Sequence, residues 1–155
     1  MKIDYFILDV DGVLTDGSFY YSDTGKIIKK FGPHDADGLK LLSEHLSIAF
    51  VSADERGFEI TKKRINDMGF DVDLVAEKNR LDYFNNNYDF ATLAFMGDGY
   101  YDKDIILNAK IGIAPNNALE EVKEVADLVT KSSGGQGAVF EACAYLNNIV
   151  NESIQ

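Results

Sequence analysis

Carboxylates gather directly after the first apolar run of the chain. The segment ILDVDGVLTDG places Asp9, Asp11 and Asp16 close together, around the end of a predicted strand. Unpaired carboxylates at this spacing repel one another, so they call for a hard cation, and Mg²⁺ prefers carboxylate, water and phosphate oxygens. An ordinary turn explains the same residues about as well, because Asp is common in turns. The segment alone leaves a metal site and a turn as equal alternatives.

A second acidic group follows another apolar run. In TLAFMGDGYYDKD, Asp98 comes directly after the run, and Asp102 lies near the start of the next helical stretch. Parallel strands bring their carboxyl ends to one edge of a sheet, so we expect Asp98 to approach Asp9 and Asp11 and to share their metal ion. Asp102 is predicted to support the site, with helix capping as an equally good explanation.

Candidate phosphate-binding residues stand after two other predicted strands. Ser52 ends the run SIAFVS, where its hydroxyl and the amides of the next helix can bind a phosphate oxygen, although capping is the commoner role of such a serine. Lys78 and Arg80 follow DVDLVA, and either can supply positive charge to a phosphate, although most such residues are simply solvated.

Strand and helix patterns alternate along the chain and must position these residues. The predicted strands are 3–9, 47–52, 71–76, 92–98 and 111–115. The predicted helices lie within 35–46, 56–70, 78–87, 103–110 and 117–128, with Asn117 as a candidate N-cap and Gly69 as a candidate C-terminal stop. This alternation predicts an α/β fold with a doubly wound, mostly parallel sheet, in one domain spanning residues 1–155.

The segment 17–31 breaks the alternation. It carries two short β-rich runs around Ser22-Asp23-Thr24-Gly25, which predicts a β-hairpin directly after the first strand. The hairpin is placed to cover the ligand-binding edge of the sheet or to pair with other subunits, and an ordinary edge hairpin is an equal alternative. Its apolar residues are more than a two-stranded ribbon can bury alone, which favours association.

Composition limits the possible partners and locations. The 155 residues carry a formal net charge of −11, which disfavours nucleic acid and anionic membranes as partners. No apolar run approaches a membrane span, and MKIDYF lacks the zones of a signal peptide, so we predict a cytoplasmic protein. A phosphate ester would need local positive charge in so acidic a protein, from a cation and a few donors. Cys143 lies among apolar residues and is expected to pack in the core.

The candidate site segments described above resemble, in their order along the chain, the four motifs of the haloacid dehalogenase superfamily. They are DVDGVLTDG, Ser52, Lys78 or Arg80, and GDGYYD. The pattern DxDGVxTDG, followed by a hairpin and HDADGLKLL, is similar to the small capless branch of that superfamily. This branch contains phosphatases of 3-deoxy-octulosonate 8-phosphate and of nonulosonate 9-phosphates. The resemblance continues through IGIAPNNALEEVKEVADLVT and SGGQGAVFEA, so it covers Lys2 to about Ile149.

The resemblance implies a Rossmann-like fold and a Mg²⁺-dependent phosphatase of a phosphorylated 2-keto sugar acid, serving lipopolysaccharide or sialic-acid-like sugar synthesis. Asp9 would be the nucleophile, and Asp11, two residues on and expected on the same side of the strand, the general acid and base. Asp9, the backbone carbonyl of Asp11 and Asp98 would hold Mg²⁺, and Arg80 aligns with the usual phosphate-binding lysine. Relatives assemble as homotetramers through their hairpins.

Some positions depart from the family pattern and keep other functions open. Many relatives carry a second consecutive aspartate where this chain has Gly99. They often carry an arginine at the position of Phe140 and another arginine at the position of His34. A low-activity assembly or regulatory module of sugar-acid activation is therefore the alternative to an active phosphatase. A two-component receiver domain also carries an acidic cluster on a doubly wound sheet, but its phosphorylated aspartate follows a middle strand, where this chain has Ser52.

Overall fold

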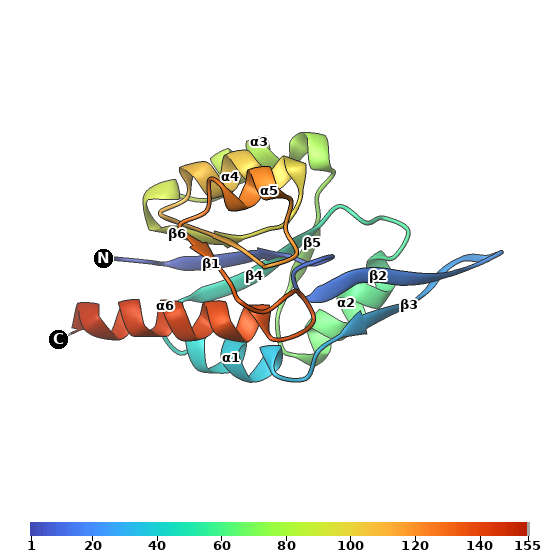
Figure 1. Ribbon diagram of the computed structural model, residues 1–155, viewed down its shortest axis with the longest axis horizontal. Coiled ribbons are helices and arrows are strands. Elements are labelled where there is room, and N and C mark those ends of the chain that lie inside the picture. Colours follow the sequence, from blue (N-terminus) through green and yellow to red (C-terminus); the bar gives the residue numbers. More distant parts are fainter. Residues whose placement is uncertain (155) are drawn as a thin grey trace.

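The central sheet is parallel and is built from the predicted apolar runs. The computed structural model describes residues 1–154 (Figure 1). Its sheet strands are β1 (Tyr5–Asp9), β4 (Ser47–Ser52), β5 (Val72–Leu74), β6 (Leu93–Met96), β7 (Ile111–Ala114) and β8 (Leu128–Val129). They lie side by side in the order β5-β4-β1-β6-β7-β8, and every neighbouring pair runs parallel. The doubly wound fold that the alternation predicted is confirmed.

The strand order reverses between β1 and β6. The chain leaves β1 toward β4 and β5 on one side, then returns to β6, β7 and β8 on the other. In open α/β sheets, ligands bind outside the carboxyl ends of the strands at such a reversal, and here these ends carry Asp9 and the segment leading to Asp98. A receiver domain would instead have the flavodoxin-like order 2-1-3-4-5, so the topology excludes that alternative.

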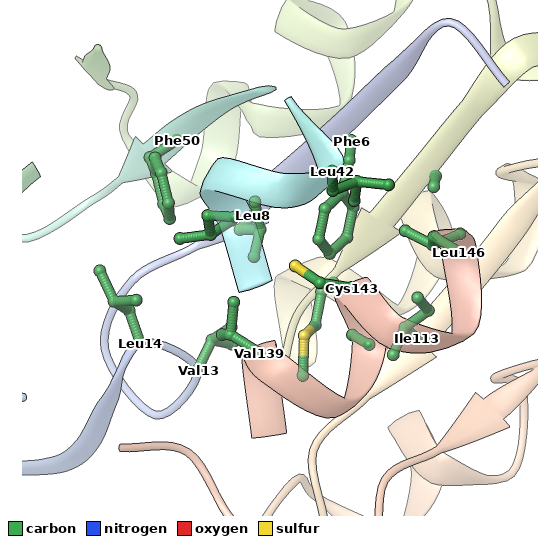
Figure 2. Close-up of a cluster of buried hydrophobic side chains, with 14 of the residues drawn as sticks. Phe6, Leu8, Val13, Leu14, Leu42, Phe50, Ile113, Val139, Cys143 and Leu146 are labelled. Carbon is green, nitrogen blue, oxygen red and sulfur yellow. The ribbon is translucent and has the colours of Figure 1, made fainter. Parts of the chain in front are cut away.

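Helices cover both faces of the sheet (Figure 1). The helices are α1 (Asp35–Leu42), α2 (Phe58–Asp67), α3 (Arg80–Asn87), α4 (Lys103–Asn108), α5 (Glu120–Lys123) and α6 (Ala138–Ile154). Side chains of β1 alternate between two cores: Phe6 and Leu8 pack with α1, α2 and α6, whereas Ile7 packs with α3, α4 and α5. Figure 2 shows the first core, where Cys143 lies among Leu42, Val139 and Leu146, as expected. Among the described helices, none is long and apolar enough to cross a membrane.

The predicted hairpin is present as a separate antiparallel pair, β2 (Thr15–Ser22) and β3 (Gly25–Phe31). It projects beyond the carboxyl edge of the main sheet, away from both chain ends (Figure 1). The register between its strands is irregular in two places, between Thr15 and Phe19 and between Tyr20 and Tyr21. Such bulges turn the side chains of a ribbon, and they decide which hairpin residues face the domain.

The structure corrects the prediction for 117–128. Helix α5 covers only Glu120–Lys123, and its N-cap is Leu119 rather than Asn117. The Asn117 side chain instead donates from Nδ2 to the Gly12 carbonyl at 2.9 Å. Its Oδ1 accepts from the backbone amide of Gly134 at 2.7 Å. These long-range bonds use the polar atoms that a cap would need. Gly69 follows α2 with φ +90, which confirms it as the C-terminal stop.

Candidate active site

A cavity of about 550 Å³ opens at the carboxyl edge of the sheet, where the strand order reverses. It brings together side chains from β1, from the loops after β1 and β6, and from α3. The predicted site residues among its lining are Asp9, Asp11, Arg80, Asp98 and Asp102. The two carboxylate groups that lie far apart in the sequence therefore converge in one cavity, as the parallel sheet predicted.

Asp9 is paired with the only arginine of this cavity lining. Asp9 lies in β1 on the same side as Ile7, the face that α3 covers, and Arg80 is the first residue of α3. The Arg80 Nη2 atom lies 3.2 Å from Asp9 Oδ1, and the two side chains are 4% and 12% exposed. The start of α3 thus carries a fixed positive charge to the end of β1.

Asp98 lies opposite Gly12 in the loop after β1. Gly12 has φ +83, and a Cβ added there would come within 2.0 Å of Asp98 Oδ2. The glycine therefore allows both a left-handed backbone and the close approach of the carboxylate. One carboxylate oxygen each from Asp9, Asp98 and Asp102 lies within 4.8 Å of the others, an arrangement able to hold a metal ion. This carboxylate set fits a hard divalent cation.

Asp102 has most of its hydrogen-bonding capacity already in use. Its Oδ1 accepts from Arg80 Nη1 at 2.6 Å, and its Oδ2 accepts from the amides of Asp98 and Gly99 at 3.1 Å each. Asp102 therefore holds Arg80 and the loop after β6, which leaves Asp9 and Asp98 as the better candidates for binding a metal ion. These bonds fit both alternatives considered for Asp102, support of the site and capping of the segment after β6.

Burial, and then the charge of neighbouring carboxylates, raises the pKa of Asp9 and of Asp98. Burial, followed by the charge of Asp102, raises the pKa of Asp98 to about 6. Burial, followed by the charge of Asp102, raises the pKa of Asp9 well above its ordinary value, although Arg80 opposes this effect. Arg80 has its own pKa raised by Asp9 and Asp102 against the effect of burial, so it stays charged. The site holds more negative charge than Arg80 compensates, which favours a bound cation.

Asp11 lines the cavity but does not share the partners of Asp9. Strand β1 ends at Asp9, so the alternation that would put both carboxylates in one direction stops there. The Lys29 ammonium lies 2.9 Å from Asp11 Oδ1 and 3.0 Å from Oδ2. The Asp11 carboxylate is also outside the group of side-chain oxygens that could hold a metal. The strand alternation that would direct Asp9 and Asp11 to one side therefore does not extend to Asp11, although both side chains line the cavity.

Ser52 and Lys78 do not line the cavity. Ser52 is buried at the end of β4, and its Oγ accepts from the Asp54 amide at 3.2 Å. Lys78 instead lines a separate hollow with Tyr100 and Tyr101. Of the two candidate cations, Arg80 is the one that the fold places beside Asp9.

Of the other positions singled out in the sequence, Asp16, His34 and Phe140 lie outside this cavity. Asp16 accepts from the Ser18 amide at 2.9 Å, which is the turn role considered for it. His34 precedes α1 and makes no capping bond with its side chain. Phe140 is on α6, where its amide donates to Asp35. Gly99 does line the cavity, and it contributes its amide to Asp102.

Two lysines of the hairpin were missed by the sequence reasoning. Lys26 lines the cavity, and Lys29 on β3 pairs with Asp11 of its lining. Both lysines also form ion pairs with Asp54, at 2.7 and 2.8 Å. In GKIIKKF no pattern separates the buried Lys29 from the exposed Lys30, because the bulged register decides which of them faces the domain. These lysines supply part of the local positive charge that so acidic a protein needs near an anion.

Comparison with known proteins gives a consistent result. A family described as haloacid dehalogenase-like hydrolase matches residues 79–142. The chain is 30% identical over 146 residues to 3-deoxy-D-manno-octulosonate 8-phosphate phosphatase KdsC of Haemophilus influenzae, covering 90% of this chain and 80% of the relative.

Solved structures give the same answer for the fold. The cobalt-bound deoxy-D-mannose-octulosonate 8-phosphate phosphatase of Haemophilus influenzae has a TM-score of 0.85 and 29% identity, covering 98% of this chain and 91% of the other. The Moraxella catarrhalis 3-deoxy-D-manno-octulosonate 8-phosphate phosphatase, solved with magnesium, phosphate and a KDO molecule, has a TM-score of 0.84 and 25% identity, with the same coverage of 98% and 91%. With these matches and a carboxylate cluster at the strand-order reversal, the chain belongs to the haloacid dehalogenase-like phosphatases, in the branch of 3-deoxy-D-manno-octulosonate 8-phosphate phosphatase.

Proposed function

We propose that this chain is a Mg²⁺-dependent phosphomonoesterase that acts on a phosphorylated 2-keto sugar acid through an aspartyl-phosphate on Asp9. The substrate would be 3-deoxy-octulosonate 8-phosphate or a nonulosonate 9-phosphate. One observation carries the proposal: Asp9 lies at the strand-order reversal, with Arg80 3.2 Å away and Asp98 close enough to share a cation. The relatives that resemble the whole chain are named for the 8-phosphate.

Asp9 and Asp11 would divide the chemistry between them. A carboxylate oxygen of Asp9 attacks phosphorus, the bond from phosphorus to the ester oxygen breaks, and the carboxyl proton of Asp11 passes to the leaving oxygen. Asp11, now a carboxylate, takes a proton from water, whose oxygen attacks phosphorus. The bond to Asp9 then breaks, and inorganic phosphate leaves with Asp11 protonated again. Both side chains line the cavity, which is what this sequence of steps requires.

Positive charge around the phosphoryl group would come from the cation and from Arg80. Mg²⁺ would be held by Asp9, Asp98 and the backbone carbonyl of Asp11, and when bound it neutralises charge on the transferred phosphoryl group. Arg80, fixed by Asp102, would bind a phosphoryl oxygen with its planar fork. Ser52 and the amides that follow β4 would bind another, because Ala53 and Asp54 line the cavity. Lys78 lines a separate hollow and would not take part.

We also infer that the hairpin joins subunits into a homotetramer. It exposes a cluster of apolar side chains, each about half or more accessible: Phe19, Tyr20, Tyr21, Ile27 and Ile28. A surface of this kind on a monomer marks an interaction site. Ile28→Asp should lower the mass measured by sedimentation, whereas Lys30→Asp on the same strand should not. An unchanged mass for Ile28→Asp would reject this interface.

The cytoplasmic location stays a prediction.

A phosphate-release assay tests the proposed activity. The protein is incubated with 3-deoxy-octulosonate 8-phosphate, nonulosonate 9-phosphates and other sugar phosphates, with and without Mg²⁺, as wild type and as Asp9→Asn. We expect release only from wild type with Mg²⁺, and fastest from one of the sugar acids. Release that survives Asp9→Asn would reject the nucleophile. Absence of release from every ester by a folded protein would leave the assembly or regulatory module as the function.

A further inference from the structure

A lysine of the hairpin is buried against the candidate acid and base of the site. The side chain of Lys29 is fully buried, at 0% exposure, and its ammonium lies within 3.0 Å of both Asp11 oxygens. A buried ammonium is costly unless each of its donors has a partner. Lys29 donates hydrogen bonds to Asp11 and to the Thr61 hydroxyl at 2.9 Å. Its charge is also paired with Asp54 at 2.8 Å, so the buried ammonium faces two carboxylates and a hydroxyl.

The carboxylate of Asp11 has a single anchor. Within residues 1–152, whose side chains the structure describes, Lys29 is the group that hydrogen-bonds or pairs with it. The Asp11 side chain is also 34% exposed, so without Lys29 it would rotate freely in the cavity mouth. Lys29 cannot follow such a rotation, because Thr61 on α2 and Asp54 after β4 hold its ammonium from the other side.

The groups around Lys29 balance their charges when Asp11 is ionised. Lys26 pairs with Asp54 at 2.7 Å, so two ammonium groups face two carboxylates. In the proposed reaction Asp11 is ionised once it has protonated the leaving oxygen, and it must then stay directed at the water that attacks the aspartyl-phosphate. An anchored cation is most useful to Asp11 in this second half of the reaction.

We propose that Lys29 is a positioning residue for Asp11, which it orients for hydrolysis of the aspartyl-phosphate. The inference rests on the proposed function, because it takes the roles of Asp9 and Asp11 from there. It predicts a selective defect: without Lys29, the phosphoenzyme forms but breaks down slowly. A residue that only attaches the hairpin to α2 would not separate the two half-reactions in this way.

The main test uses Lys29→Met with p-nitrophenyl phosphate as substrate. This ester has a good leaving group, so forming the phosphoenzyme needs little help from an acid. In rapid-quench experiments with Mg²⁺, we expect p-nitrophenol to appear in a burst of near one equivalent, followed by turnover at least tenfold slower than wild type, with KM lowered in parallel. Acid-stable phosphate should accumulate on the protein. Lys29→Arg should recover most of the turnover, and Lys30→Met, on the exposed side of β3, should behave as wild type.

A second variant covers the case in which Lys29→Met does not fold. Gly57 has an ordinary backbone conformation, with φ −108, and a Cβ there would lie 2.7 Å from Lys29 Cε and 2.3 Å from Asp54 Oδ2. Gly57→Ala therefore displaces the ends of these side chains while keeping every charge. We expect the same burst and slow second step, in weaker form.

Three results separate the possible outcomes. A folded Lys29→Met or Gly57→Ala that turns over like wild type overturns the positioning role. A variant whose p-nitrophenol burst and steady-state turnover fall by the same factor also overturns the positioning role, because a structural defect gives that pattern. If wild type itself forms no phosphoenzyme, or Asp9→Asn still turns over, then the proposed function has failed and Lys29 has lost its role with it.

Discussion

The Nη2 atom of Arg80 lies 3.2 Å from a carboxylate oxygen of Asp9, and both side chains are almost completely buried. The pair joins the start of α3 to the end of β1, and Asp102 holds the other end of the guanidinium at 2.6 Å. A cation is therefore fixed beside the proposed nucleophile by the fold itself.

Replacing Arg80 should affect stability and catalysis differently according to the substitute. Arg80→Met leaves Asp9 and Asp102 buried without a cation, so the free energy of unfolding should fall by about 3–5 kcal/mol. Arg80→Lys keeps the charge but loses the planar fork, so the protein should fold while kcat drops about tenfold to a hundredfold. Urea titrations and phosphate release measure these effects. Lys78→Met should change neither quantity, and a loss of kcat there would give Lys78 the role assigned to Arg80.

The stability of the metal-free protein should depend on pH through Asp98. Burial, together with Asp102, raises the pKa of Asp98 to about 6, whereas an unfolded Asp titrates near 3.9. The folded state therefore binds more protons between these values, and this group makes the protein less stable as pH rises from about 4 to about 6. Bound Mg²⁺ relieves the repulsion between the ionised carboxylates, so the rise in Tm on adding Mg²⁺ should be larger at pH 7.5 than at pH 5.

Asp98→Asn tests the same relationship. Without that charge, the metal-free protein at pH 7 should gain about 1–3 kcal/mol of stability, and Mg²⁺ should no longer raise its Tm. Activity should be lost at the same time. Thermal unfolding with and without Mg²⁺ measures the change, and a Tm gain equal to that of wild type would show that Asp98 does not bind the ion.

Gly12 and Gly17 form a matched pair for testing the approach of Asp98. Their φ angles are +83 and +85, so alanine should be strained by a similar amount, about 1 kcal/mol, at either position. At Gly12 the new Cβ would lie 2.0 Å from Asp98 Oδ2, whereas at Gly17 the nearest atom is 3.7 Å away. Gly12→Ala should therefore weaken Mg²⁺ binding at least tenfold, as measured by calorimetry, and Gly17→Ala should leave it unchanged. Equal affinities would mean that Asp98 moves aside at no cost.

Cys143 should be inert in the folded protein. Burial, followed by the charge of Asp35, raises the pKa of its thiol to about 12, and the side chain is 1% exposed. At pH 8 it should react with a disulfide reagent only as fast as the protein opens, so labelling should follow the rate of unfolding across a urea series. Rapid labelling without urea would contradict the packing in Figure 2.

Most of the architecture could be predicted because it rests on local patterns. The run 47–52 became β4 with the same bounds, and the convergence of Asp9 and Asp98 followed from the rule that parallel strands end at one edge. The remainder depends on contacts between distant segments. The buried Lys29 bonds to Thr61, 32 positions along the chain, from a hairpin whose register is irregular. Asn117 does not cap a helix and bonds instead to Gly12, 105 positions away. No pattern within a short stretch of sequence contains such information.

The placement of the chain ends has a practical consequence. In Figure 1 the start of β1 and the end of α6 lie together at the amino edge of the sheet, opposite the cavity and the hairpin. A fluorescent label, an affinity tag or a whole protein fused at either end would point away from the cavity and the hairpin. Immobilisation on a surface through either end should therefore leave the entrance facing the solution, so the enzyme could be assayed on a support without redesign.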